Sequence, residues 1–200
     1  MNERISEIWE GYRDTVKPLL EDIKVRRGNY NLPNNFLNEI RALNDHIARC
    51  YRKDIKKDDI NSELTKAEGH LRRLVYDCFK QLNIYISDEL IRKEKLFYSD
   101  LWLFHDKGKF WEHYSDYRKS AQNNVIEAKK NESIDSDIAM SFYEQAFINY
   151  RNAEELLINN KKMLYKSFFV KWSLKIRSFA SWLIITVILS FIGALIGFLW

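Results

Sequence analysis

Five charged or titratable residues that could cooperate in chemistry lie close together on one predicted helix. Glu68 and Arg72 are four residues apart, as are Arg73 and Asp77, and His70 lies among them. Residues spaced by four face the same side of a helix, so both pairs can form ion pairs along its surface. If that surface is buried, the pairs are costly to desolvate and mark a structural or functional polar cluster. The alternative, to which we give equal weight, is that these are solvated ion pairs on the helix surface.

A second candidate is the pair Arg41 and His46, separated by four residues. This spacing resembles the motif of the HEPN ribonucleases. The resemblance implies that His46 acts as an acid or base and that Arg41 holds the negative charge of the scissile phosphate. Ala42 stands where the active family usually has a polar residue, and an ordinary surface arginine with a partly buried histidine is the alternative.

Motifs for metals and common cofactors are absent from the sequence. It contains no HExxH motif, no histidine and cysteine spacing typical of zinc, no Walker loop and no GxGxxG. We therefore predict neither a metal site nor a cofactor. Cys50 and Cys78 fall inside helical patterns, which predicts free thiols in a core, with a disulfide as the alternative.

The elements that position these residues are predicted to be helices. Only two prolines and six glycines occur in 200 residues, and apolar residues recur at helical spacing. We predict an all-α fold, with a cytoplasmic helical bundle over residues 1–160. Pro18 should kink or split the first helix, Ser87 could begin a separate helix, and Gly69 suggests close approach of another helix. The predicted helices cover 3–26, 34 or 35 to about 51, 62 to about 107, 110–130, and 138 onward into the C-terminus.

Positive charge is concentrated just after the body, in a segment of residues 161–178 that carries six cations and no acid. Apart from these six, the body is close to neutral, which argues against a nucleic-acid-binding surface spread over the whole domain. Aromatic and aliphatic residues alternate with the cations, which predicts a basic amphipathic segment at a membrane surface. The cations are Lys161, Lys162, Lys166, Lys171, Lys175 and Arg177.

The final residues, 179–200, contain no charge. As a helix they extend about 33 Å, close to the thickness of a bilayer core, and Trp182 and Trp200 lie near the two ends. We predict a single C-terminal transmembrane helix, with a buried core helix as the alternative. The cations before it place the body in the cytoplasm by the positive-inside rule.

Small or weakly polar residues form a stripe on this last helix. Such stripes allow another helix to approach closely, so we predict self-association and a face that could line a pore. A monomeric anchor is the alternative. No strong helix breaker lies between residues 138 and 193, so the last helix is predicted to run unbroken from the body into the membrane; a break near 159–162 would count against this. The stripe consists of Thr186, Ser190, Gly193, Ala194 and Gly197.

Together, the helical body, the Arg41–His46 spacing, the run 67–77 and the single span resemble one family. It is the small membrane accessory protein of type VI-B CRISPR loci, a divergent HEPN-like family. The resemblance implies a homo-oligomeric pore in the bacterial inner membrane that depolarises it and enhances RNA-guided antiphage defence. It also implies membrane lipids and an RNA-guided nuclease complex as partners, and leaves RNA binding open.

Three functions remain in competition at this stage. The first is a membrane effector whose bodies assemble and whose anchors form or gate a pore. The second is a catalytically inert adaptor that holds a cytoplasmic partner at the membrane. The third is a tethered ribonuclease using Arg41 and His46.

Overall fold

The computed structural model describes residues 2–29, 31–97 and 108–199. Every regular element in these ranges is a helix and none is a strand, which confirms the all-α prediction. The predicted helix through 98–107 lies outside the described residues. So do the side chains of 96, 97, 164–168, 170, 171, 174 and 191–199.

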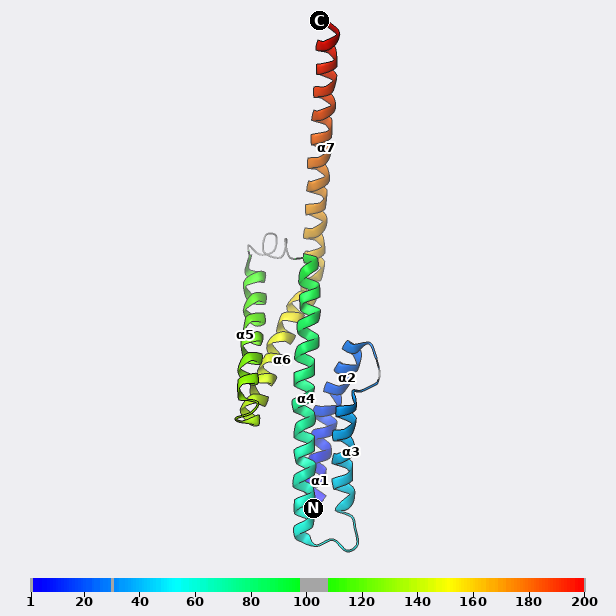
Figure 1. Cartoon of the computed structure of the whole chain (residues 1–200), viewed down its shortest axis with the longest axis vertical. Coiled ribbons are helices and arrows are strands. Elements are labelled where there is room, and N and C mark those ends of the chain that lie inside the picture. The colour runs from blue at the N-terminus through cyan, green and yellow to red at the C-terminus, as the bar shows by residue number, and fades with distance from the viewer. Residues whose placement is uncertain (1, 30, 98–107, 200) are drawn as a thin grey trace.

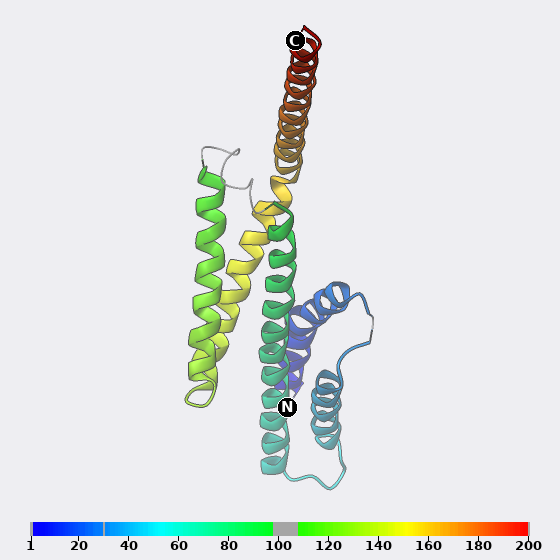
Figure 2. The ribbon, with the colours of Figure 1, turned by 45° about the horizontal axis from the view of Figure 1, so that its top comes forward.

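A single long helix, α4 (Lys57–Phe97), is the axis of the bundle. The N-terminal helices pack along its first half, and α6 packs against it with α5 on the outside (Figure 1). The tilted view shows these two groups on either side of α4 (Figure 2). The other body elements are α1 (Asn2–Gly11), η1 (Tyr12–Val16), α2 (Lys17–Arg27), α3 (Asn34–Arg49), α5 (Lys109–Asn131) and α6 (Ser136–Asn159).

One continuous core joins the two groups, because apolar residues at helical spacing on each helix turn toward α4. Both cysteines lie in this core as free thiols, as predicted. Burial raises the pKa of the Cys78 thiol to about 12, so it stays protonated and unreactive. The largest fully buried side chains include Ile8, Ile23, Phe36, Leu43, Leu74, Leu82 and Tyr114.

Pro18 alters the first helix without ending it. The chain is helical from Asn2 to Arg27, but five residues before the proline, Tyr12–Val16, form a wider π-helical turn. Proline lacks an N–H and its ring crowds the carbonyl four residues earlier, and a wider turn relieves both problems. The predicted disturbance is therefore present as a π turn.

The structure decides three details of the predicted helices. Of the two possibilities at Ser87, a new helix or one that runs on, the second holds, because α4 runs on to Phe97. The predicted close approach at Gly69 is wrong: a Cβ placed there would have no neighbour within 4 Å. The N-cap of α6 is Asp135, whose carboxylate accepts hydrogen bonds from the N–H groups of Asp137 and Ile138.

The helix from the body to the C-terminus is not continuous, contrary to the prediction. α6 ends at Asn159, and α7 (Lys161–Leu199) begins after the single residue Asn160. The Leu156 carbonyl accepts both the backbone N–H of Asn160, at 3.1 Å, and its side-chain amide, at 2.8 Å. α7 then leaves the bundle, touching it through α6 near its start (Figure 1).

Within the described part of the chain, no helix qualifies as long and apolar enough to cross a membrane. The predicted span at 179–200 includes ten residues, 191–200, whose side chains lie outside the description. Gly193, Ala194 and Gly197 of the predicted stripe are among these ten. The side chains of Lys166 and Lys171 of the basic segment also lie outside the description.

Candidate functional site

The two groups of candidate residues, treated separately in the sequence, meet at the α3–α4 contact. His46 of α3 hydrogen-bonds through Nδ1 to Oε2 of Glu63 of α4 at 2.7 Å. His70 of α4 hydrogen-bonds through Nδ1 to Oε2 of Glu39 of α3 at 2.6 Å. Each helix therefore supplies one histidine and one carboxylate, and the pairs cross between the helices. We name these four residues the His46–His70 cluster.

The two imidazole rings of this cluster stack on each other, with their centroids 5.1 Å apart and their planes 19° apart. The four side chains are between 12% and 24% exposed, so the cluster is shielded but reaches water at its edge. Hydrogen bonds from Lys66 and then from His46 lower the pKa of Glu63 to about 2. A carboxylate that stays ionised in this way is a strong orienting group for an imidazole.

The hydrogen bonds determine which histidine nitrogen carries a proton. An ionised carboxylate only accepts, so Nδ1 of each ring must donate to its glutamate. Arg73 Nη2 lies 3.0 Å from Nδ1 and 3.4 Å from Nε2 of His70, and Arg73 Nε lies 3.2 Å from Oε2 of Glu39. With Nδ1 donating to Glu39, Nε2 of the neutral ring is left as an acceptor beside the Arg73 guanidinium.

The predicted ion pairs along α4 do not form in the described structure. Glu68 instead receives a bidentate arginine fork from Arg4 of α1, with both Nη2 distances at 2.8 Å. Arg72 reaches Asp137 at the start of α6. The pairing predicted from i,i+4 spacing is wrong because α4 is packed on several sides, and residues of other helices reach these side chains first.

Asp77, the last member of the predicted polar cluster, faces inward. It is half-buried, and burial raises the pKa of its carboxyl above the ordinary value, an effect that nearby Lys80 opposes. Of the predicted cluster, only His70 and Arg73 therefore belong to the His46–His70 site.

Arg41 lies outside this site. It is exposed on α3, whereas His46 on the same helix turns toward α4. Five residues of an α-helix rotate a side chain by roughly 140°, so the two cannot point the same way within one chain. The structure thus brings His46 together with His70, Glu39 and Glu63, and it leaves Arg41 apart.

A sequence signal for the cluster exists, although the initial reasoning missed it. Glu39 precedes His46 by seven residues, and Glu63 precedes His70 by the same interval. Seven residues are about two helical turns, so the glutamate and the histidine of the same helix share a face. When two such helices pack antiparallel, each glutamate faces the histidine of the other helix.

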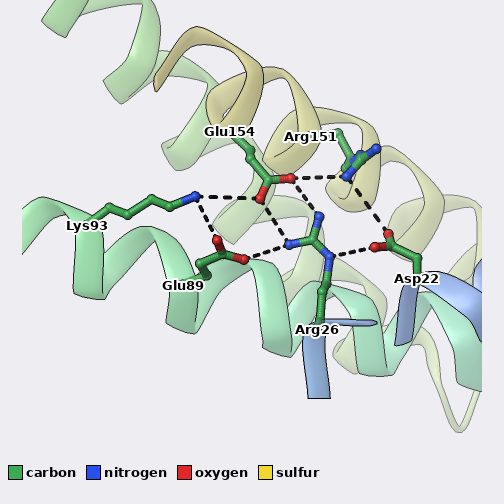
Figure 3. Close-up of polar contacts among 6 residues, drawn as sticks. All are labelled: Asp22, Arg26, Glu89, Lys93, Arg151 and Glu154. Carbon is green, nitrogen blue, oxygen red and sulfur yellow. Dashed lines mark hydrogen bonds and ion pairs between the residues drawn. The ribbon is translucent and has the colours of Figure 1, made fainter. Parts of the chain in front are cut away.

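A second polar centre joins α2, α4 and α6 around Arg26 (Figure 3). The guanidinium forms a fork with Glu154, with bonds of 2.6 and 3.0 Å, and further bonds of 2.9 Å to Asp22 and to Glu89. Lys93 bonds Glu89 at 2.7 Å and Arg151 bonds Glu154 at 3.1 Å. We name these six residues the Arg26 network.

The Arg26 network is balanced in charge, with three cations and three carboxylates. Burial opposes ionisation of Glu154, but the hydrogen bonds and charge of Arg26 outweigh it and hold the pKa of Glu154 below its ordinary value. The side chain of Arg26 is only 9% exposed and that of Glu154 8%. The two central side chains are therefore shielded and paired, and the network fixes how three helices meet, while Arg151 at its edge is 50% exposed. Its partners lie 63 and 128 residues from Arg26, so no local pattern predicts it.

The C-terminal candidates are partly described. Thr186 and Ser190 are exposed, and their hydroxyls donate to the carbonyls four residues earlier, at 2.9 and 2.8 Å. The described cations of the basic segment are also exposed, namely Lys161, Lys162, Lys175 and Arg177.

The arrangement at α3 and α4 can orient imidazoles and bind an anion, but it contains no obvious nucleophile. In the residues for which the structure gives positions, no group of histidine, cysteine and acidic side chains is placed to hold a metal ion. Comparisons with models of known families, with curated proteins and with solved structures found no match.

Proposed function

We propose that the protein is a membrane effector: α7 inserts into the bilayer, copies assemble through it, and the assembly opens a pore that depolarises the membrane. The observation that carries this proposal is α7 itself. It extends away from the bundle (Figure 1), and the large apolar side chains described on it are exposed, from 44% at Leu183 to 65% at Phe169. An apolar surface of this length needs a cover of lipid or of other copies.

The polar groups of α7 support the same proposal. Ser181, Thr186 and Ser190 each donate a hydroxyl hydrogen bond to the carbonyl four residues before, between 2.8 and 2.9 Å. In lipid every polar group must find a partner within the protein, and these three have one within their own helix. The exposed cations at the start of α7 suit anionic headgroups on the cytoplasmic side.

Membrane insertion is tested with the full-length chain and liposomes. We expect the wild-type chain to float with liposomes and to remain bound after a carbonate wash. Ile188→Arg places a charge near the middle of the apolar run and should weaken insertion by about 2.5–3.5 kcal/mol. Ile134→Arg is the matched control, because Ile134 is 79% exposed in the turn between α5 and α6. A wild-type chain that the carbonate wash releases would contradict the proposal.

Assembly and pore formation need a separate test. Gly193→Leu fills the small-residue stripe and should reduce both the oligomeric mass in detergent and dye release from liposomes. Val187→Leu, which adds bulk beside the stripe, is the control and should change neither. A wild-type chain that inserts but releases no dye and passes no current would favour the adaptor instead.

The ribonuclease alternative has one observation in its favour: Glu63 orients the imidazole of His46 at 2.7 Å. Arg41 would then have to come from a second chain, since it lies apart from His46 in this one. RNA cleavage by the wild type that disappears in His46→Ala would support this function. The link to RNA-guided antiphage defence is supported by the resemblance of the sequence alone.

A further inference from the structure

A groove beside the His46–His70 cluster belongs to none of the functions above. It lies between α4 and the start of α6, with a volume of about 420 Å³. This is within the usual range for small-molecule sites, about 300–1,000 Å³. Its lining includes Lys66, Gly69, His70, Arg72 and Arg73 of α4, and Ser136 of α6.

Gly69 is the least expected residue of this groove. It lies in the interior of α4, where glycine is less favourable than any residue except proline. Gly11 has a packing reason, because a Cβ there would lie 3.0 Å from Cδ2 of Leu71. Gly69 has none, because its Cβ would meet nothing within 4 Å. The bare backbone leaves space in the groove that the fold itself does not use.

The charge of the lining identifies what could use that space. Three cations line the groove, Lys66, Arg72 and Arg73, against one carboxylate, Glu132. Each cation also has a carboxylate partner beside the groove, and that of Lys66 is Glu63, at 2.7 Å. Glu132 is already engaged, since it bonds Lys80 at 2.8 Å. Ser136, in the first turn of α6, also lines the groove.

The two arginines are held in place but remain available. The Arg72 side chain is 49% exposed and bonds Asp137, and that of Arg73 is 59% exposed and bonds Glu39. Ion pairs this exposed contribute little to stability, so another anion can replace the carboxylates at low cost. The planar guanidinium fork matches the oxygens of a phosphate group.

We propose that this groove binds a small phosphate-bearing molecule, held by Arg72 and Arg73 over the bare backbone at Gly69. The binding is independent of membrane insertion, because every residue involved lies in the bundle.

The test is calorimetric titration of the full-length chain with AMP, glycerol 3-phosphate and inorganic phosphate, and with adenosine as the uncharged control. We expect at least one of the phosphate probes to bind, with a stoichiometry of one molecule per chain, and adenosine not to bind. Binding of inorganic phosphate alone would identify a free-phosphate site, and preference for AMP or glycerol 3-phosphate an organic phosphate site. Failure of all three phosphate probes to bind would overturn the proposal.

Two variants test the location. Gly69→Leu places a side chain in the groove at a position where its Cβ meets no neighbour within 4 Å. It should weaken binding of the probe at least tenfold, with an unchanged circular dichroism spectrum. Arg73→Gln should weaken binding of the probe about as much. Arg52→Gln is the control and should leave binding unchanged, because the Arg52 side chain is 64% exposed and pairs with Asp54 in the α3–α4 loop. Unchanged affinity in Gly69→Leu, or a change only in oligomeric mass, would show that the groove is not a phosphate site.

Discussion

The Arg26 network and the His46–His70 cluster both join helices through charged hydrogen bonds, but they differ in what surrounds them. The arginine at the centre of the first is 9% exposed and has carboxylate partners on α2, α4 and α6. The second lies at a single contact, α3 with α4, beside a groove lined by half-exposed arginines. The first is closed and balanced, while the second keeps an acceptor nitrogen and exchangeable cations at its edge.

This difference indicates a division of roles. Buried charges must be fully paired, because an unpaired one has no water to replace its partner. The Arg26 network is therefore suited to holding the bundle in one arrangement. Half-exposed charges can change partners, since water and incoming anions compensate for the loss. The His46–His70 side of the molecule is where a ligand can be exchanged.

The largest expected effect is the loss of the central cation in Arg26→Met. Three carboxylates then remain around a buried apolar side chain, and the free energy of unfolding should fall by about 3–5 kcal/mol. Chemical unfolding followed by circular dichroism measures this. The double variant Arg26→Met with Glu154→Leu should recover part of the loss, because it removes a carboxylate that would otherwise be left unpaired.

A smaller effect is expected for Glu39→Gln on the other side. The change removes the charge that His70 and Arg73 share, but the amide oxygen can still accept a hydrogen bond. We expect a loss of about 1 kcal/mol in the same unfolding assay. A loss as large as that of Arg26→Met would show that the two centres stabilise the fold equally, and would contradict the difference proposed between them.

Gly69→Ala should raise stability, by about 0.5–1 kcal/mol, because alanine favours the helix and its methyl group meets no neighbour. Thermal unfolding measures the gain. Gly11→Ala is the control and should gain less, since its methyl group would contact Leu71. A destabilising Gly69→Ala would show that something in the folded protein already occupies the groove.

The smallest effect is a dependence on acid pH. In the folded protein the pKa of Glu63 is lowered to about 2, from an ordinary value of 4.5. A lowered folded-state pKa means that this carboxylate stabilises the protein above about pH 4.5 and that the contribution is lost as the pH falls toward 2. Unfolding of Glu63→Gln should therefore vary less with pH in this window than unfolding of the wild type. Equal slopes for the two proteins would contradict the proposed role of Lys66 and His46.

Much of the secondary structure follows from local pattern. Apolar residues at helical spacing, with few breakers, predicted the helices at 34–51 and 110–130 to within about two residues of α3 and α5. The burial of Cys50 and Cys78 followed from the same spacing. The break at Asn160 did not follow from the sequence. Asn149, inside α6, makes the same side-chain bond to the carbonyl four residues earlier, so an asparagine does not by itself mark the end of a helix.

The candidate site was predicted in pieces. The sequence singled out His46 and His70, but it paired each with residues of its own helix, Arg41 and the charges near Glu68. A local pattern reports only neighbours along one helix, whereas the partners of both histidines come from the helix packed against it.

The sequence by itself determined the helical class, the polar and apolar faces, and the charge-free run at the C-terminus. These depend on residue type and on spacing over a few turns, which the covalent chain fixes. Only the tertiary structure decided that Glu39 meets His70, that Arg26 meets Glu154, and that Gly69 borders a groove. Such contacts depend on which helices pack together and at what register, and that is set by the burial of the whole core at once.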